Sequence, residues 1–251
     1  MKKSFYEPYN IFNMKNSLAI YIPLYNEEEG IANLKLELKK LQFQLAKKCD
    51  FEIILVDDGS TDNTLNLLNE NFNEQPFKII THTNNKNLGG FLKTAINDCE
   101  KDFIAFLDSD CTYKPSIIND MYDLSLKGHE IVNASPYHPE GVVVGVDKIR
   151  LFLSRSINLA YRVIVKKDFY TTSSICKIYK TDLAKSITIT RKNFIAVSEL
   201  FTKCMLVIDT GVDYPCTLTV RQYGFSKLDI YGNIIDHINY VFHFLIYKYR
   251  K

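Results

Sequence analysis

The chain has 251 residues, of which 46% are hydrophobic and 24% charged, a balance typical of a globular protein with one large core. Its formal net charge is +2, from 31 basic and 29 acidic residues, so the basic excess of a nucleic-acid-binding protein is missing and no nucleic acid partner is expected. The cysteines show no CxxC pair and no zinc-ligand spacing, which fits a reducing cytoplasm. No apolar stretch reaches the roughly 18 residues of a membrane span.

The first half of the chain alternates short apolar runs with helical patterns. After a leader at 1–16, we expect strands at 17–24, 51–56, 77–82 and 101–107. Helical patterns follow these runs, at 31–41, 63–73, 91–99 and after Pro115. Strands that alternate with helices predict a mostly parallel sheet with right-handed crossovers, and therefore an α/β fold.

Polar turns follow the first, second and fourth of these strands. They contain Asn26-Glu27, Asp57-Asp58 and the pair Asp108 and Asp110. Because the carboxyl ends of parallel strands share one edge of a sheet, these turns are expected to converge there. Two carboxylates spaced i, i+2 can share a hard divalent cation such as Mg²⁺ or Mn²⁺, which would hold a substrate diphosphate. The alternative is that both aspartates only cap the turn into the helix that Pro115 opens.

The first of these turns also has a purely structural interpretation. Asn26 is a suitable N-cap for the helical pattern that follows, and Glu27, Glu28 and Glu29 would complement the dipole of its first turn. We keep this interpretation for Glu28 and Glu29.

Four motifs of the first half together resemble the nucleotide-sugar half of family 2 glycosyltransferases with the GT-A fold. They are IPLYNE (22–27), VDDGSTD (56–62), NLGG (87–90) and LDSD (107–110). The resemblance implies a domain at 17–228 with a nucleotide-sugar half at 17–115. It also implies donor-binding residues at Pro23, Tyr25, Asn26, Glu27, Asp57, Asp58, Asn87 and Asp108, and a metal site at Asp108 and Asp110. The glycine that the family usually has two residues after Gly89 is Phe91 here.

The second half, 116–228, resembles the acceptor half of polyprenyl-phosphate sugar synthases of the dolichol-phosphate mannose synthase type. The motifs are SPYHPEG (135–141), LFLSRSINLAYR (151–162), TTSSICKIYK (171–180) and VRQYGFSKL (220–228). The resemblance implies that Arg155 and Arg221 bind a lipid phosphate, with Ser226 and Lys227 close by in the last motif. Pro136 and Thr112 stand where some synthases have an arginine and a glutamine.

Phosphate chemistry agrees with two arginines. A phosphate monoester, with a second pKa near ~6, is largely a dianion at cytoplasmic pH and can attack an anomeric carbon without a general base. It needs orientation and charge neutralisation, and the planar guanidinium binds phosphate oxygens bidentately. The structural alternatives are a solvated helix residue for Arg155 and an exposed edge-strand charge for Arg221.

Two further segments of the second half have two interpretations each. Glu199, in a helical pattern at 193–206, either lies near the acceptor or pairs with Lys203 at i, i+4. The C-terminal segment 229–251 is an amphipathic helix with a basic end, which either lies in a membrane interface or packs on its own domain.

The two resemblances imply a metal-dependent, inverting glycosyltransferase, which we expect to be cytoplasmic and peripheral on the inner membrane face. It would move a hexosyl unit from a nucleotide-diphosphate sugar to a polyprenyl phosphate. GDP-mannose is the first candidate for the donor, and UDP-glucose or UDP-N-acetylglucosamine is the second. A glycan hydroxyl acceptor is the nearest alternative and would need a general base such as Glu199. A non-catalytic sugar-nucleotide binding protein is a remote one. A dinucleotide oxidoreductase is disfavoured because no GxGxxG follows the first strand.

Overall fold

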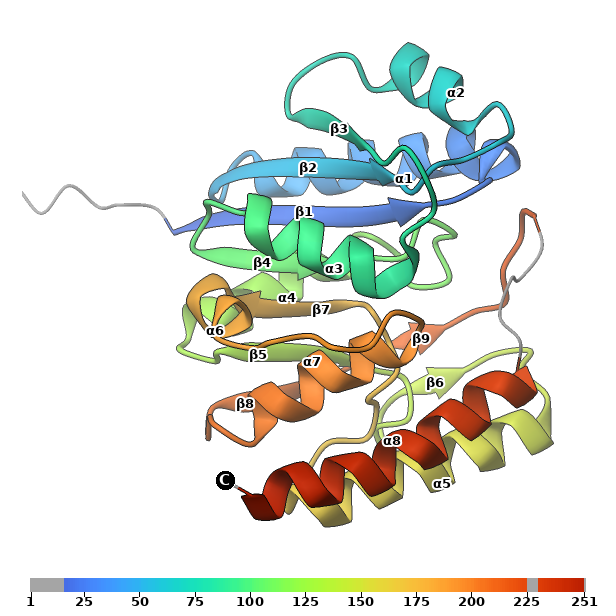
Figure 1. Ribbon diagram of the computed structural model, residues 1–251. Coiled ribbons are helices and arrows are strands. Elements are labelled where there is room, and N and C mark those ends of the chain that lie inside the picture. Colours follow the sequence, from blue (N-terminus) through green and yellow to red (C-terminus); the bar gives the residue numbers. More distant parts are fainter. Residues whose placement is uncertain (1–15, 225–229, 251) are drawn as a thin grey trace, which may run out of the picture.

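The computed structural model describes residues 16–224 and 230–250 (Figure 1). Its strands are β1 Ser17–Leu24, β2 Asp50–Asp57, β3 Phe77–Thr81, β4 Phe103–Phe106, β5 Ile131–Ser135, β6 Val142–Val143, β7 Lys177–Lys180, β8 Gly211–Pro215 and β9 Thr217–Leu218. Its helices are α1 Ile31–Leu45, α2 Thr64–Asn71, α3 Asn87–Asp98, α4 Ile117–Leu126, α5 Lys148–Val165, α6 Thr181–Lys185, α7 Ile195–Met205 and α8 Ile230–Arg250.

Seven strands form one sheet in the order β3-β2-β1-β4-β7-β5-β8, and β6 pairs with β9 in a second, small sheet. The first four strands of the order run parallel, as predicted. β7 runs antiparallel to both of its neighbours, β4 and β5, while β8 is again parallel to β5. The predicted α/β fold with a mostly parallel sheet is therefore confirmed.

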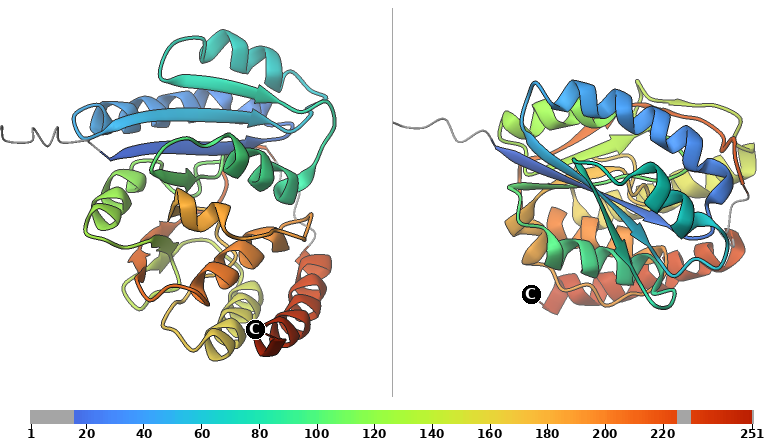
Figure 2. Two further views of the ribbon diagram at one scale, coloured as in Figure 1. Left: turned by 60° about the vertical axis from the view of Figure 1, so that its left-hand side comes forward. Right: turned by 90° about the horizontal axis from the view of Figure 1, so that it is seen from above.

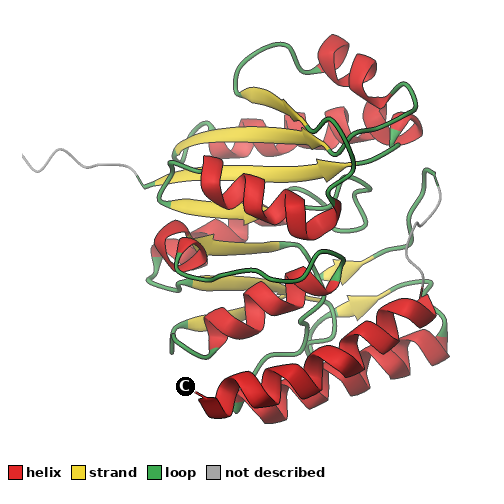
Figure 3. Ribbon diagram, in the orientation of Figure 1, coloured by secondary structure: helices red, strands yellow, loops and turns green. Residues whose placement is uncertain are grey.

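Helices cover both faces of this sheet (Figures 2 and 3). On one face, α1 buries the stripe Ile31, Leu34, Leu38, Leu41 and Leu45 in a core cluster that also takes residues from α2 and α4. On the other face, α3, α6 and α7 contribute to a second cluster, and α5 and α8 lie side by side and add buried residues to it, among them Tyr161 and Tyr240. Apolar residues spaced three and four apart along α1 explain why this helix packs with one face only.

α3 begins four residues earlier than the sequence pattern predicts, at Asn87 instead of Phe91. The two glycines of the NLGG motif lie inside its first turn. The Gly89 amide donates a hydrogen bond of 2.7 Å to the Lys192 carbonyl oxygen. A Cβ on Gly89 would lie 2.2 Å from the Arg191 carbonyl oxygen, so this approach requires glycine.

The C-terminal helix α8 packs on its own domain. Tyr240 and Phe244 are buried in the second core cluster, and the Tyr240 hydroxyl lies 3.0 Å from Thr202 Oγ1 of α7. His237 Nδ1 lies 2.9 Å from the Tyr161 hydroxyl of α5. Across residues 16–224 and 230–250, the helices fall short of the length and apolar character that crossing a bilayer requires.

Candidate active site

The turns after β1 and β2 are joined by hydrogen bonds at one edge of the sheet. The Asp58 amide donates to the Leu24 carbonyl oxygen at 2.8 Å, and the Asn26 amide donates to Ser60 Oγ at 2.9 Å. Asn26 has a positive φ of 53°. Its side chain accepts a hydrogen bond of 2.7 Å from the Thr61 amide and caps no helix, because α1 starts only after a 3-10 turn at Glu28–Gly30. The predicted cap at Asn26 is therefore wrong, and the residue joins two turns.

A hollow of about 530 Å³ lies beside Asp57 at this edge. Its walls are Tyr25, Asp57, Gly59, Ser60, Thr61, Leu65, Thr81, His82, Thr83, Asn84 and Asn85. Gly59 has a φ of +75°, and a Cβ there would lie 2.8 Å from the Asn84 carbonyl carbon. Pro23 lies next to this wall at the end of β1, and Asn87 is exposed at the start of α3.

Asp58 is buried and supports the wall of this hollow from behind. Its Oδ1 lies 2.6 Å from His82 Nδ1 and accepts a hydrogen bond of 2.9 Å from the Lys86 amide. His82 Nε2 lies 2.9 Å from Thr94 Oγ1 of α3. The side chain of Asp58 thus ties the turn after β3 to the turn after β2. His82 is a supporting residue that sequence reasoning missed, because a lone histidine after a strand carries no signal of its own.

Asp108 and Asp110 follow β4 at the same edge. Asp110 Oδ1 accepts a hydrogen bond of 3.0 Å from the Thr112 amide, which closes the local turn. Neither aspartate caps α4, whose N-cap is Ser116. Burial, and next the charge of Asp110, raise the pKa of Asp108 well above its usual range, while Lys177 and Arg221 oppose this shift.

A divalent cation would relieve the repulsion between these two carboxylates, and their oxygen atoms are the ligands that Mg²⁺ and Mn²⁺ prefer. In the described part of the chain, no group of three or more His, Cys, Asp or Glu side chains is arranged to bind a metal ion. Asp108 and Asp110 thus fit a cation that takes its other ligands from substrate and water.

Arg221 points into the site from the segment after β9. Its guanidinium donates to Glu27 Oε2 of the turn after β1, and its Nε donates to the Tyr223 carbonyl oxygen at 2.6 Å. The Arg221 side chain is only 18% exposed, so it is not a solvated edge-strand charge. Glu29 accepts a hydrogen bond of 3.0 Å from the Gly224 amide, which adds a second link between the two segments.

Arg155 lies on α5 with its side chain exposed. Within residues 16–224 and 230–250, no hydrogen bond or ion pair joins it to another side chain. Arg221 thus lies with Glu27 and Asp108, whereas the structure does not bring Arg155 into contact with them. Ser226 and Lys227 lie outside the described residues.

Lys177 is a charged residue of the site that sequence reasoning missed. It begins β7, pairs with Phe106 of β4 and is fully buried. Its Nζ donates to the carbonyl oxygens of Thr172 and Ser174. Burial lowers the pKa of Lys177 to about 7, against the charges of nearby acidic groups that include Asp108 and Asp213. The sequence signal that could have identified this residue is a lysine inside the short, otherwise apolar run CKIY.

Glu199 is buried, and both oxygens of its carboxylate accept hydrogen bonds. It accepts hydrogen bonds from Lys203 Nζ at 2.7 Å, from Thr190 Oγ1 at 2.6 Å, and from the amides of Thr190 and Arg191 at 2.8 Å. The predicted pairing with Lys203 is therefore confirmed. Glu199 holds the segment whose Lys192 carbonyl oxygen contacts Gly89 of α3.

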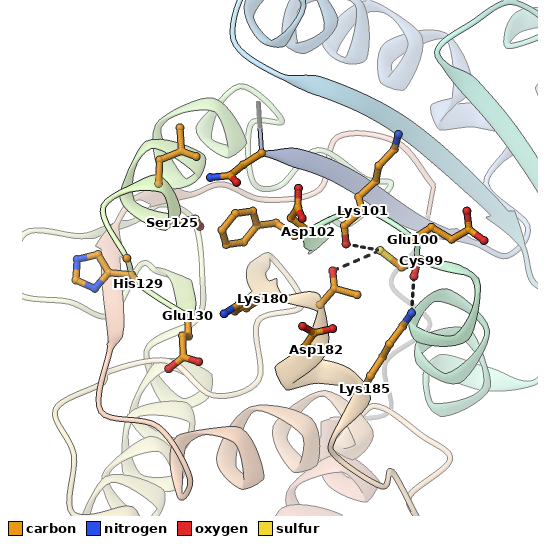
Figure 4. A pocket seen from close by; sticks show the side chains of 15 residues that line it. Cys99, Glu100, Lys101, Asp102, Ser125, His129, Glu130, Lys180, Asp182 and Lys185 are labelled. Carbon is orange, nitrogen blue, oxygen red and sulfur yellow. Dashed lines mark hydrogen bonds between the residues drawn. The ribbon is translucent and has the colours of Figure 1, made fainter. Parts of the chain in front are cut away.

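A second hollow, of about 450 Å³, lies at the opposite edge of the sheet (Figure 4). Its walls include residues that precede β1, β4 and β5, among them Asn16, Asp102 and Glu130. Lys185 Nζ donates to the Cys99 carbonyl oxygen there at 2.7 Å, and Lys101 pairs with Asp50 at 2.6 Å. This hollow contains none of the predicted site residues.

Comparison with known proteins places these features in a family. The sequence profile of glycosyl transferase family 2 matches residues 19–188. An undecaprenyl-phosphate 4-deoxy-4-formamido-L-arabinose transferase of Proteus mirabilis is 32% identical over 123 residues, which are 48% of this chain and 37% of the relative. A dolichol-phosphate mannosyltransferase of Pyrococcus furiosus is 24% identical over 213 residues, which are 84% of this chain and 59% of the relative. The chain thus spans between about a third and three fifths of these relatives.

Solved structures with the same fold include glucosyl-3-phosphoglycerate synthase from Mycobacterium tuberculosis in complex with Mn²⁺, uridine diphosphate and glucosyl-3-phosphoglycerate. It superposes with a TM-score of 0.66 at 18% identity and covers 90% of this chain and 80% of its own. At this identity the likeness concerns the fold. The profile match spans well over half of the sequence, and the chain therefore belongs to glycosyl transferase family 2.

Proposed function

We propose that this protein is a metal-dependent, inverting glycosyltransferase that moves a hexosyl unit from a nucleotide-diphosphate sugar to a polyprenyl phosphate. The observation that carries the proposal is the shared edge of the sheet. The hollow beside Asp57, the carboxylates Asp108 and Asp110, and the cations Arg221 and Lys177 all meet there. The relatives described as acting with undecaprenyl phosphate and dolichol phosphate support this choice of acceptor.

The donor half provides binding and charge compensation. The nucleotide would occupy the hollow beside Asp57, and its diphosphate would lie toward Asp108 and Asp110. A Mg²⁺ or Mn²⁺ ion held by the two carboxylates would offset the charge that develops on the departing nucleoside diphosphate. Solved members of the fold that contain Mn²⁺ and uridine diphosphate support the use of such an ion.

The acceptor half provides the cations. Arg221 would exchange its contact with Glu27 for the acceptor phosphate, and Arg155 would bind the same group from α5. A dianionic phosphate attacks without help from a base. Attack on the face of the sugar opposite the diphosphate inverts the anomeric centre. Because the acceptor is a lipid, the reaction would take place at a membrane surface, in this proposal the cytoplasmic face of the inner membrane.

A hydroxyl acceptor is the weaker alternative because it requires a general base. Glu199 was the candidate base, and its carboxylate already accepts four hydrogen bonds inside the domain. A carboxylate so occupied is unsuited to take a proton from a substrate. This observation favours an acceptor that is already ionised.

The test is transfer of radiolabelled sugar into the organic phase with Mn²⁺ and a polyprenyl phosphate, with GDP-mannose as first donor and UDP-glucose and UDP-N-acetylglucosamine as the next. Asp110→Asn keeps the acceptor atom for the Thr112 amide but removes a charge, and transfer is expected to fall about 1,000-fold. Asp209→Asn, at a side chain that is 99% exposed, is the control.

The alternatives give different results in this assay. Donor binding with no transfer to any acceptor would indicate a non-catalytic sugar-nucleotide binding protein. Transfer only to a hydroxyl acceptor would also contradict the proposal. Unchanged transfer in Asp110→Asn would rule out the proposed metal site.

A further inference from the structure

Lys177 is a buried cation that has no direct ion-pair partner. Its side chain is fully buried, and among the described residues no carboxylate oxygen lies within ion-pair distance of its Nζ. The Nζ donates to two backbone carbonyl oxygens and lies 4.9 Å from the ring centroid of Phe201 on α7. Removing an ammonium group from water is costly, and such groups are concentrated at functional sites. Lys177 is therefore a candidate for a role in the reaction.

The two carbonyl oxygens belong to one irregular stretch, residues 171–174, which we call the TTSS segment. Side chains of α5 and β5 hold the same segment. Asn158 of α5 accepts hydrogen bonds of 2.8 and 2.6 Å from the amide and the hydroxyl of Thr172. Asn133 of β5 donates to the Thr171 carbonyl oxygen at 2.8 Å. The segment is thus fixed in position although it is neither a helix nor a strand.

The TTSS segment connects the proposed cation site with the helix that carries Arg155. On one side, Lys177 pairs with Phe106 of β4, two residues before Asp108, and its positive charge favours the ionised form of this aspartate. On the other side, Asn158 lies on α5 three residues after Arg155. A continuous series of buried contacts therefore runs from the end of β4 through the TTSS segment to α5.

The distance that this series spans matters for the proposed reaction. A bond forms between an acceptor phosphate oxygen and the anomeric carbon while the bond from that carbon to the diphosphate oxygen breaks, and no proton has to move. The attacking oxygen must lie about 3 to 3.5 Å from the carbon, and a displacement of about 1 Å can lower the rate about 100-fold. A rigid connection between the cation site and α5 would keep this distance constant.

We infer that Lys177 is a positioning residue for sugar transfer, which acts through the TTSS segment to hold α5 and its Arg155 at a fixed distance from the cation site. The inference rests on the proposed function, because it assigns the two ends of this distance to donor and acceptor. Lys177 contacts neither substrate in this role, since its Nζ is buried and directed at the carbonyl oxygens of Thr172 and Ser174.

Two variants of Lys177 separate its hydrogen bonds from its charge. Lys177→Met removes both at similar size, whereas Lys177→Gln removes the charge but keeps two N–H donors for the carbonyl oxygens. Lys177→Met should lower kcat for transfer to polyprenyl phosphate about 100-fold, while the dissociation constant of the donor, measured by calorimetry, changes less than about threefold. Lys177→Gln should recover at least about tenfold of this loss. Equal losses in both variants, with a changed Mn²⁺ requirement, would assign Lys177 to Asp108 alone and overturn the inference.

Thr172 offers a milder change in the same segment. Thr172→Val keeps the shape of the side chain and the amide bond to Asn158 but removes the hydroxyl bond. We expect kcat to fall about tenfold with an unchanged melting temperature. Because Lys177 and Thr172 act through one segment, the double variant Lys177→Gln with Thr172→Val should lose less than the product of the two single losses. Losses that multiply would show two independent effects and overturn the inference.

Lys185→Met is the matched control. Lys185 Nζ also donates to a backbone carbonyl oxygen, that of Cys99, at 2.7 Å, but at the opposite edge of the sheet. Its kcat should equal that of the unmodified chain, and an equal loss in this control would overturn the inference. Normal transfer by Lys177→Met would overturn the inference and leave the proposed function intact. An unmodified chain that transfers sugar to no polyprenyl phosphate would instead overturn the proposed function, and the inference with it.

Discussion

The proposed donor side and the proposed acceptor side of the site differ in how firmly they are held by internal contacts. On the donor side, hydrogen bonds that the Asn26 and Asp58 side chains accept hold the turns after β1, β2 and β3 together. On the acceptor side, Arg155 is exposed on an outer helix and Arg221 is held mainly through Glu27 of the donor side. A preformed pocket suits a small nucleotide, because less ordering is needed when it binds. A more open arrangement suits a long lipid that enters from one side.

The contact that joins the two sides allows the strongest test of this contrast. Gly89→Ala would place a methyl group against the backbone of Arg191 and Lys192, where the donor-side helix α3 meets the second half of the chain. We expect a loss of about 3 kcal/mol in the free energy of unfolding, measured by urea denaturation. Gly30→Ala is the control, since no atom lies within 4 Å of the added Cβ. Equal stability of the two variants would show that the halves do not depend on this contact.

Arg221, which we propose binds the acceptor phosphate, provides a test that separates acceptor binding from donor binding. Arg221→Ala should lower kcat/KM for the polyprenyl phosphate about 100-fold, or about 2.7 kcal/mol, and Arg221→Lys should recover only part of it because lysine lacks the planar fork. The dissociation constant of the donor, measured by calorimetry, should change less than about threefold. Arg162→Ala, at a half-buried arginine that pairs with the exposed Asp168, serves as the control. A parallel loss of donor affinity would place Arg221 on the donor side instead.

Asp58 tests whether the donor pocket is preformed by its supporting residues. Asp58→Ala leaves the His82 ring and the Lys86 amide without their acceptor, at an expected cost of about 2 kcal/mol in unfolding free energy. The donor dissociation constant should rise as well, because the turn after β3 lines the hollow. Asp168→Ala removes an exposed ion pair and should cost less than about 0.5 kcal/mol. A stable variant with normal donor affinity would contradict this role.

His237 gives the smallest effect near neutral pH, and it concerns the helix α8. Burial lowers its pKa from 6.5 to about 4, so the unfolded chain binds more protons than the folded one between these values. Stability should therefore fall as the pH drops below 6.5 and level off below pH 4, with a loss of about 1 kcal/mol near pH 6. Denaturation at several pH values measures it. His237→Leu should flatten the profile over this range, whereas His243→Gln, at an exposed position on α8, should not.

Much of this arrangement could be predicted from the sequence. The apolar runs at 17–24, 51–56 and 77–82 become β1, β2 and β3, and the polar turns after β1, β2 and β4 share one edge because these strands are parallel. Local chemistry is enough for such predictions, since burial of a short strand and a polar turn at its end both leave a clear pattern.

The remaining features depend on contacts between distant residues. Asn26 has the composition of an N-cap, but its partner is Thr61, 35 positions away. The early start of α3 depends on the Lys192 carbonyl oxygen, which no local pattern reveals. Lys177 resembles an ordinary strand residue until its pairing with Phe106 places it beside Asp108. The roles of Arg155, Ser226 and Lys227 stay predictions.

The reversed direction of β7 has a consequence for how substrate preference can change in this fold. Because β7 is antiparallel to β4, it begins at the edge of the sheet where β4 ends. The segment that precedes β7 therefore approaches the proposed active site separately from the connections that follow β1, β2 and β4. In this segment, the carbonyl oxygens of Thr172 and Ser174 accept hydrogen bonds from Lys177 Nζ. If the proposed function holds, insertions or exchanges upstream of Lys177 would alter recognition of the acceptor while the connections proposed to bind the nucleotide keep their sequence.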